Sequence, residues 1–222
     1  MDAKAVERVT SWAEQVADET IHVVGVLAAL LAVPVMVTLA AVWRDDGATI
    51  AAVAIYGVTM VAMLGLSAGY NMANLRARSA FLIETLRRLD HAAIYVKIAG
   101  TYTPYAVIAG GPVGRWLLIG VWSGAVLGLL GKLIAPDRWE RASVILYLAL
   151  GWAFVFAAGP VSDAIATETM VLIIVGGCLY TTGVIFHVWT RLPFQNAIWH
   201  FFVLAATFVF YSAMTVEIAI GQ

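Results

Sequence analysis

Charged residues are scarce in this sequence of 222 residues: only 12 % are Asp, Glu, Lys or Arg, and the formal net charge is -1. An ordinary soluble domain has about 25 % charged and roughly 45–50 % apolar residues, whereas 62 % of this chain is hydrophobic. This composition excludes an ordinary soluble domain, and the net charge indicates no basic surface for nucleic acid.

Cysteine is also nearly absent, since Cys178 is the one cysteine and lies inside an apolar run. One cysteine cannot form an intrachain disulfide, and it excludes most metal sites built from thiolates. The first 20 residues are polar and acidic and lack a short apolar core. We therefore expect no cleavable signal peptide, and we expect the first helix to direct insertion into the membrane.

Long apolar stretches dominate what remains, and each is long enough to cross a bilayer core of about 30 Å, which needs roughly 20 residues per helix. No β pattern competes with helices. We predict an all-α seven-transmembrane helix bundle, with a cytoplasmic N-terminal segment over 1–20 and one transmembrane domain over 21–222. The predicted spans are about 21–43, 49–72, 91–108, 116–134, 142–158, 170–190 and 197–220.

The basic residues are distributed unevenly between the two sides of these spans. The side of the N-terminus carries ten of the 13 Lys and Arg residues: Lys4, Arg8, Arg76, Arg78, Arg87, Arg88, Lys132, Arg138, Arg141 and Arg191. Arg44 and Arg115 lie on the other side, and Lys97 lies within the third span. Because basic loops stay in the cytoplasm, we predict a cytoplasmic N-terminus and an outside C-terminus in a bacterial inner membrane. Tryptophans expected at the membrane interfaces are Trp43, Trp116, Trp139 and Trp189.

Strongly polar side chains gather at the cytoplasmic ends of the predicted spans. They are Asp18, Glu19, His22, Ser67, Asn71, Asp90, His91, His187, Asn196 and His200. Such groups are costly within a bilayer and mark candidate sites, although any one of them can simply join two helices by a hydrogen bond. His187 also suits a helix C-terminus. Since five helices contribute to one layer, the set as a whole favours a cavity. At the opposite end we expect Asp163, Glu168 and Glu217 to be solvated or interfacial.

Several motifs give the chain a family resemblance. The stretch LDHAAIYVKIAGTYTPY, over 89–105, resembles the third-helix motif of the hemolysin III family, the bacterial branch of the progestin and adipoQ receptor (PAQR) superfamily. ETIHVVG, GWAFVFAAGP, LYTTGVIF and NAIWHFFVLAA are similar to its other segments and occur in the same order. The resemblance implies a zinc site near the cytoplasmic leaflet, similar to that of alkaline ceramidases, and the hydrolysis of lipid amides.

The resemblance also assigns roles to residues, with two departures. In the family, a Ser-xxx-His on the second helix and a His-xxx-His on the seventh supply three imidazoles, and an Asp on the third helix orients water. Here Ser67, Asp90 and His200 match as catalytic residues, but Asn71 and Asn196 replace two of the imidazoles. His200, Asn71 and Asn196 would then be the metal ligands, and two amides bind zinc more weakly than two imidazoles. Asp90, His91 or His22 are the alternative ligands.

Lys97 is a further departure, seven residues after Asp90 on nearly the same face of the third helix. Side chains lean toward the helix N-terminus, so we hypothesise that its ammonium supplies positive charge near Asp90, across a gap of about 10 Å. The alternative is that Lys97 bonds to helix carbonyls or lines a wet cavity. His22, His91, Lys97, Asp18 and Glu19 are thus the expected supporting residues.

Three functions follow: a zinc-dependent lipid amide hydrolase, a metal-free protein for lipid binding or membrane homeostasis, and a pore-forming cytolysin. The third ranks last, because no predicted helix has a continuous polar stripe. A retinal protein is set aside on the strength of the third-helix motif. Membrane lipids are the expected partners and nucleic acid is not, with a homo-oligomer left open. Gly124 and Gly128 form a GxxxG motif that permits close helix packing.

Overall fold

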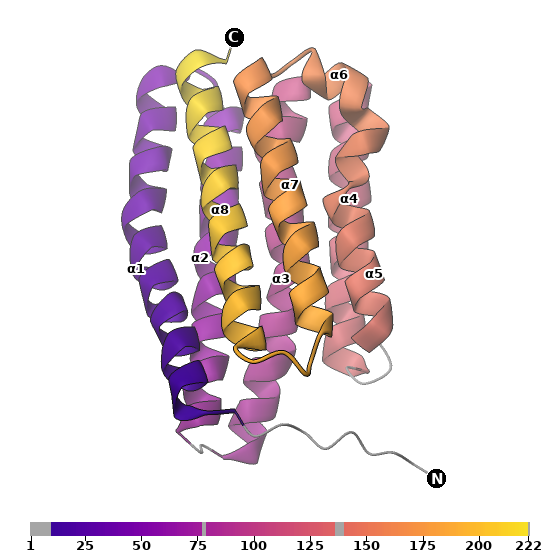
Figure 1. Cartoon of the computed structure of the whole chain (residues 1–222). Helices are drawn as coiled ribbons and strands as arrows, with labels where there is room; N and C mark the ends of the chain where they lie inside the picture. Colours follow the sequence, from indigo (N-terminus) through magenta and orange to yellow (C-terminus); the bar gives the residue numbers. More distant parts are fainter. Residues whose placement is uncertain (1–9, 77–78, 136–139, 222) are drawn as a thin grey trace.

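The structure is a computed structural model that describes residues 10–76, 79–135 and 140–221, and over these ranges it is all-helical (Figure 1). Its helices are α1 (Trp12–Trp43), α2 (Gly47–Leu75), α3 (Ala80–Ala109), α4 (Gly111–Ile134), α5 (Glu140–Gly151), the 3-10 helix η1 (Ala153–Ala157), α6 (Ala158–Ser162), α7 (Thr167–Val188) and α8 (Gln195–Ile220). Lys4, Arg8, Arg78, Arg138 and Trp139, which entered the orientation and interface predictions, lie outside the described residues, as does the side chain of Arg141.

Two helices begin well before their predicted spans. The Ser11 side chain accepts a hydrogen bond from the Glu14 backbone while the Glu14 side chain bonds to the Ser11 backbone, and this capping box starts α1 inside the segment predicted as 1–20. Ser79 caps α3, which begins at Ala80, eleven residues before the predicted start at His91. On this extension, hydrogen bonds from Arg87 and Arg88 lower the pKa of the Glu84 carboxyl to about 2.

Five helices, α1, α2, α4, α7 and α8, are long and apolar enough to cross a membrane. Their outward faces are apolar, as Leu27 and Leu31 of α1 illustrate. The third predicted span falls in α3, where Lys97 and several hydroxyl residues lower the hydropathy. The fifth falls on α5, which ends at Gly151 and continues as η1 and α6, so that the longest apolar helical stretch there is Ala142–Val155.

The packing order brings the first helix against the last. α1 contacts both α2 and α8, α3 lies between α2 and α4, and α7 packs on α8. Glu14, buried in the first turn of α1, accepts a hydrogen bond of 2.8 Å from the Phe194 backbone, which precedes α8. Phe194 has a left-handed φ of 59°. We call the end where α1 and α8 begin the site end, and the end where they finish the far end.

Glu217 lies at the far end and corrects one prediction. Its side chain is fully buried rather than solvated, whereas Asp163 and Glu168 are exposed as expected. The Glu217 carboxylate accepts a hydrogen bond of 3.0 Å from the Ala166 backbone, which precedes α7. Arg44, after α1, donates to the Glu217 backbone carbonyl. Glu217 therefore joins three helix ends.

The GxxxG glycines of α4 permit close packing, and this gives a testable difference. A Cβ atom on Gly128 would lie 2.3 Å from the ring of the buried Tyr95, whereas a Cβ on Gly120 would meet nothing within 4 Å. Gly128→Ala should therefore lower the free energy of unfolding by about 1–3 kcal/mol. Gly120→Ala should leave it unchanged or raise it by up to about 1 kcal/mol. Thermal unfolding of both variants in the same detergent is the measurement; equal melting temperatures would contradict this packing.

Candidate functional site

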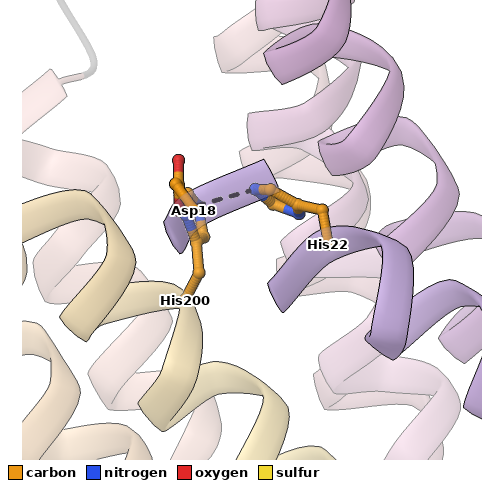
Figure 2. Close-up of side chains that lie close together, drawn as sticks. All are labelled: Asp18, His22 and His200. Atoms are coloured by element: carbon orange, nitrogen blue, oxygen red, sulfur yellow. Dashed lines mark hydrogen bonds and ion pairs between the residues drawn. The ribbon is translucent and has the colours of Figure 1, made fainter. Parts of the chain in front are cut away.

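Asp18, His22 and His200 form a buried cluster at the site end. Asp18 Oδ1 lies 2.6 Å from His200 Nδ1 and 3.9 Å from His22 Nε2, and the two imidazole rings are 4.3 Å apart. Figure 2 shows the two α1 side chains directed toward His200 of α8. Asp18 and His22 are 6 % and 5 % exposed. They share a helix face because they are four residues apart, and the α1–α8 contact brings His200 to that face.

Two predicted residues of α2 support this cluster without joining it. The Asn71 amide donates a hydrogen bond of 2.5 Å to Asp18 Oδ2, which holds the second oxygen of that carboxylate. Ser67, one turn earlier, donates to the carboxylate of Asp90 on α3, and Asp90 interacts electrostatically with His200 and Asp18. The structure thus brings together six residues predicted from the sequence, with Asp18 at their centre: Asp18, His22, Ser67, Asn71, Asp90 and His200.

The remaining predicted residues lie elsewhere. Asn196 is exposed in the first turn of α8, and Glu19 is partly buried on α1 beside the cluster. The His91 backbone carbonyl accepts a hydrogen bond from Tyr147, and its ring interacts electrostatically with Lys132, Arg87 and His187 rather than with the cluster. The imidazole nearest to His200 is therefore His22, one of the alternatives that the spacing left open.

Lys97 does not lean toward Asp90, so the contact hypothesised from the helix geometry is wrong. Lys97 Nζ donates a hydrogen bond of 2.7 Å to Thr101 Oγ1, one turn toward the far end, and it lies 4.4 Å above the ring of Tyr56. The local hydroxyl and the aromatic face of α2 compensate the buried ammonium better than a carboxylate about 10 Å away along the helix.

The donor set of the cluster suits a metal ion. One ligand atom from each of Asp18, His22 and His200 lies within 4.8 Å of the other two. Two imidazoles and one carboxylate, with a further position left open, are a ligand set of catalytic zinc sites. His22 Nε2 is buried and has no hydrogen-bond partner among the described residues, as expected for a nitrogen that serves as a ligand. If Asp18 held a metal, Asn71 would orient its carboxylate through the hydrogen bond to Oδ2.

The sequence contained a signal for this set. Asp18 and His22 are four residues apart, and Gly25 continues the same buried face of α1. A Cβ on Gly25 would lie 2.9 Å from Leu204 of α8, so the glycine permits the close approach of the two helices. The spacing alone could not say that α1 packs against α8, and for that reason Asp18 was predicted only as a supporting residue.

Comparisons with known proteins agree with the motifs. Residues 10–211 match the family described as haemolysin-III related. Hemolysin-3 of Bacillus cereus is 35% identical over 198 residues, covering 87% of each chain. The hemolysin-3 homolog of Bacillus subtilis (strain 168) is 35% identical over 197 residues, covering 87% of this chain and 89% of the other. The human monocyte to macrophage differentiation factor is 26% identical over 163 residues, covering 72% and 67%. Five helices in the described part of the chain are long and apolar enough to cross a membrane. This chain is thus a multi-pass membrane protein that belongs to the hemolysin III family.

Proposed function

We propose that this protein is a zinc-dependent hydrolase of lipid amides whose zinc is held by Asp18, His22 and His200. The observation that carries the proposal is the buried convergence of these three side chains, in a chain related to hemolysin-3. Two imidazoles and a carboxylate offset the loss of the family's imidazoles at Asn71 and Asn196, because an aspartate is a far better zinc ligand than an amide.

The surrounding residues then have distinct tasks. Bound zinc supplies a Lewis acid that polarises a carbonyl group and acidifies water. Asp90 accepts a hydrogen bond from Ser67 and faces His200, so its carboxylate is placed to take a proton from an attacking water. Hydrolysis of an amide breaks the carbon–nitrogen bond and releases a carboxylic acid and an amine, and the proton goes to the amine. Asn71 keeps the Asp18 carboxylate oriented.

The proposed function goes with a topology of seven membrane spans. Besides the five long apolar helices, α3 and the α5–η1–α6 segment would complete seven spans, with the site end in the cytoplasm of a bacterial inner membrane and residues 21–222 as one transmembrane domain. This orientation is supported by the excess of Lys and Arg on the side of the N-terminus. The site would then be reached by lipids of the cytoplasmic leaflet.

The test is the metal content of the purified protein, measured by mass spectrometry beside two single variants. We expect about one zinc per chain in the unchanged protein, loss of zinc in His22→Ala, and retention in His91→Ala. His91→Ala is the control. It removes an imidazole that lies at the same end of the bundle but does not face the cluster. Zinc retained in His22→Ala, or lost equally in both variants, would contradict the assigned ligands. Hydrolysis of ceramide-like amides is then assayed on the zinc-loaded protein.

A second candidate function, a metal-free lipid-binding protein, is favoured by one contact. The bond of 2.6 Å between Asp18 and His200 satisfies both groups without a metal. A protein that remains without zinc after reconstitution with the ion would support this alternative. A search for lipids bound to the purified chain would then replace the hydrolysis assay.

A further inference from the structure

Lys97 sits in the interior of the bundle, and no charged partner contacts it among the described residues. Its side chain is 3 % exposed, and among the described residues its polar contacts are the Thr101 hydroxyl and the ring of Tyr56. Thr101 in turn donates its own hydrogen to the Lys97 backbone carbonyl. A buried ammonium needs further hydrogen-bond acceptors, and these contacts supply only one of the three that it can use.

The polar side chains beyond Lys97 follow one helix face toward the far end. Lys97, Thr101 and Tyr105 are spaced four residues apart on α3, so they lie on one side of the helix over about 12 Å. The Tyr56 hydroxyl, on α2, interacts electrostatically with that of Tyr105, and Tyr105 interacts with Glu217. Lys97 contacts Tyr56, Tyr105 lies about two turns farther along α3, and Glu217 lies at the far end, so these residues follow one another along the bundle axis.

Apart from Lys97 and Thr101, the residues along this line carry a side-chain atom that lacks a hydrogen-bond partner among the described residues. Buried side-chain atoms without a hydrogen bond in the described part of the chain include Tyr56 OH, Tyr105 OH, Glu217 Oε1 and Arg44 Nε. Tyr56, Tyr105 and Glu217 are all at least nine-tenths buried. Orphaned polar atoms are rare in folded proteins and usually bind ordered water. Four of them along one line are better explained by a shared chain of water than by separate defects.

We infer that a narrow file of water molecules connects Lys97 to the far end of the bundle, passing Tyr56 and Tyr105 and reaching Glu217 beside Arg44. Water in this file completes the hydrogen bonds of the orphaned atoms and solvates the Lys97 ammonium. Lys97 exchanges its proton with the solution at the far end by this route. Intramembrane ionisable groups linked by hydroxyls and water are the components of proton relays.

The test uses the silver ion, which enters water-filled paths and reacts with thiols. In a cysteine-free Cys178→Ala background in lipid nanodiscs, Thr101→Cys and Lys97→Cys place a thiol on the line. Thr103→Cys is the matched control, since Thr103 is buried on the same helix and accepts a hydrogen bond from Trp122 of α4. Thiols left free after silver treatment are counted with a maleimide in denaturing detergent. We expect Thr101→Cys and Lys97→Cys to lose maleimide labelling and Thr103→Cys to keep it.

Each variant must first show the gel-filtration profile and the melting temperature of the parent. If Thr101→Cys fails to fold, the Lys97→Cys variant carries the test. Full labelling at both path positions would overturn the inference, as would equal loss at the control position. The end at which the water file opens is tested by adding Tyr105→Trp to the Thr101→Cys variant. The larger side chain should block the water file between Thr101 and the far end. Labelling of Thr101→Cys should then return; continued loss would overturn the route to the far end.

Discussion

Asparagine in place of Asp18 is expected to weaken strongly the zinc binding that we propose for the purified protein. Asp18 is the centre of the cluster, since one oxygen faces both imidazoles and the other accepts the Asn71 amide. Asn retains the shape of the side chain but loses the negative charge and presents a weakly basic oxygen. We expect the affinity for zinc to fall by about 100-fold or more, as measured by competition with a chelator of known affinity.

Glu19→Gln is the control for that experiment. Glu19 is the neighbouring acid on α1 and is partly buried, yet it lies on a different face from Asp18. Glu19→Gln removes one negative charge from the same turn of α1. A loss of zinc affinity common to both variants would therefore reflect the local negative charge rather than coordination by Asp18. An Asp18→Asn protein that binds zinc as tightly as the parent would exclude Asp18 as a ligand.

The Glu217→Ala variant should be markedly less stable than the parent. The buried carboxylate accepts the Ala166 amide at the start of α7, and α7 has no side-chain cap of its own. Alanine would leave that amide without its charge-assisted bond, and would leave a gap at the junction of α1, α7 and α8. We expect the free energy of unfolding to fall by about 2–3 kcal/mol, visible as a lower melting temperature in detergent.

Glu168→Ala is the control that separates the buried contact of Glu217 from the effect of a negative charge near the start of α7. Glu168 is an exposed acid in the first turn of α7, so its removal should change stability by less than about 0.5 kcal/mol. Suppose that Glu217→Ala has the melting temperature of the parent and Glu168→Ala a lower one. The stabilising negative charge at α7 would then be that of the exposed Glu168, and the buried contact of Glu217 would contribute little.

The sequence predicted the class of fold because membranes allow few solutions for apolar stretches of this length. It also predicted that Asp90, Ser67 and His200 lie at one end, since topology alone carries polar residues at alternating helix ends to the same side. It did not predict that Asp18 and His22 meet His200, because that requires the close approach of α1 and α8 that Gly25 permits. The positions of the spans along the sequence do not show that α1 packs against α8.

Two other failures have local causes. The lean of Lys97 was argued from the average direction of side chains in helices, and a single hydroxyl at Thr101 outweighs that average. Glu217 was expected in water because it lies near the end of the chain. Burial there depends on Arg44 and Ala166, which come from two distant helices and were not predicted to meet it.

The bond between Glu14 and the Phe194 backbone spans 180 positions of the sequence, and Asp18 and His200 are separated by 182. Both contacts link α1 with α8, which is synthesised much later. During biogenesis, neither can form until the start of α8 has left the ribosome and reached the bilayer. A nascent or truncated chain therefore holds two of the cluster's three side chains without the third, and the arrival of α8 is the event that assembles the centre.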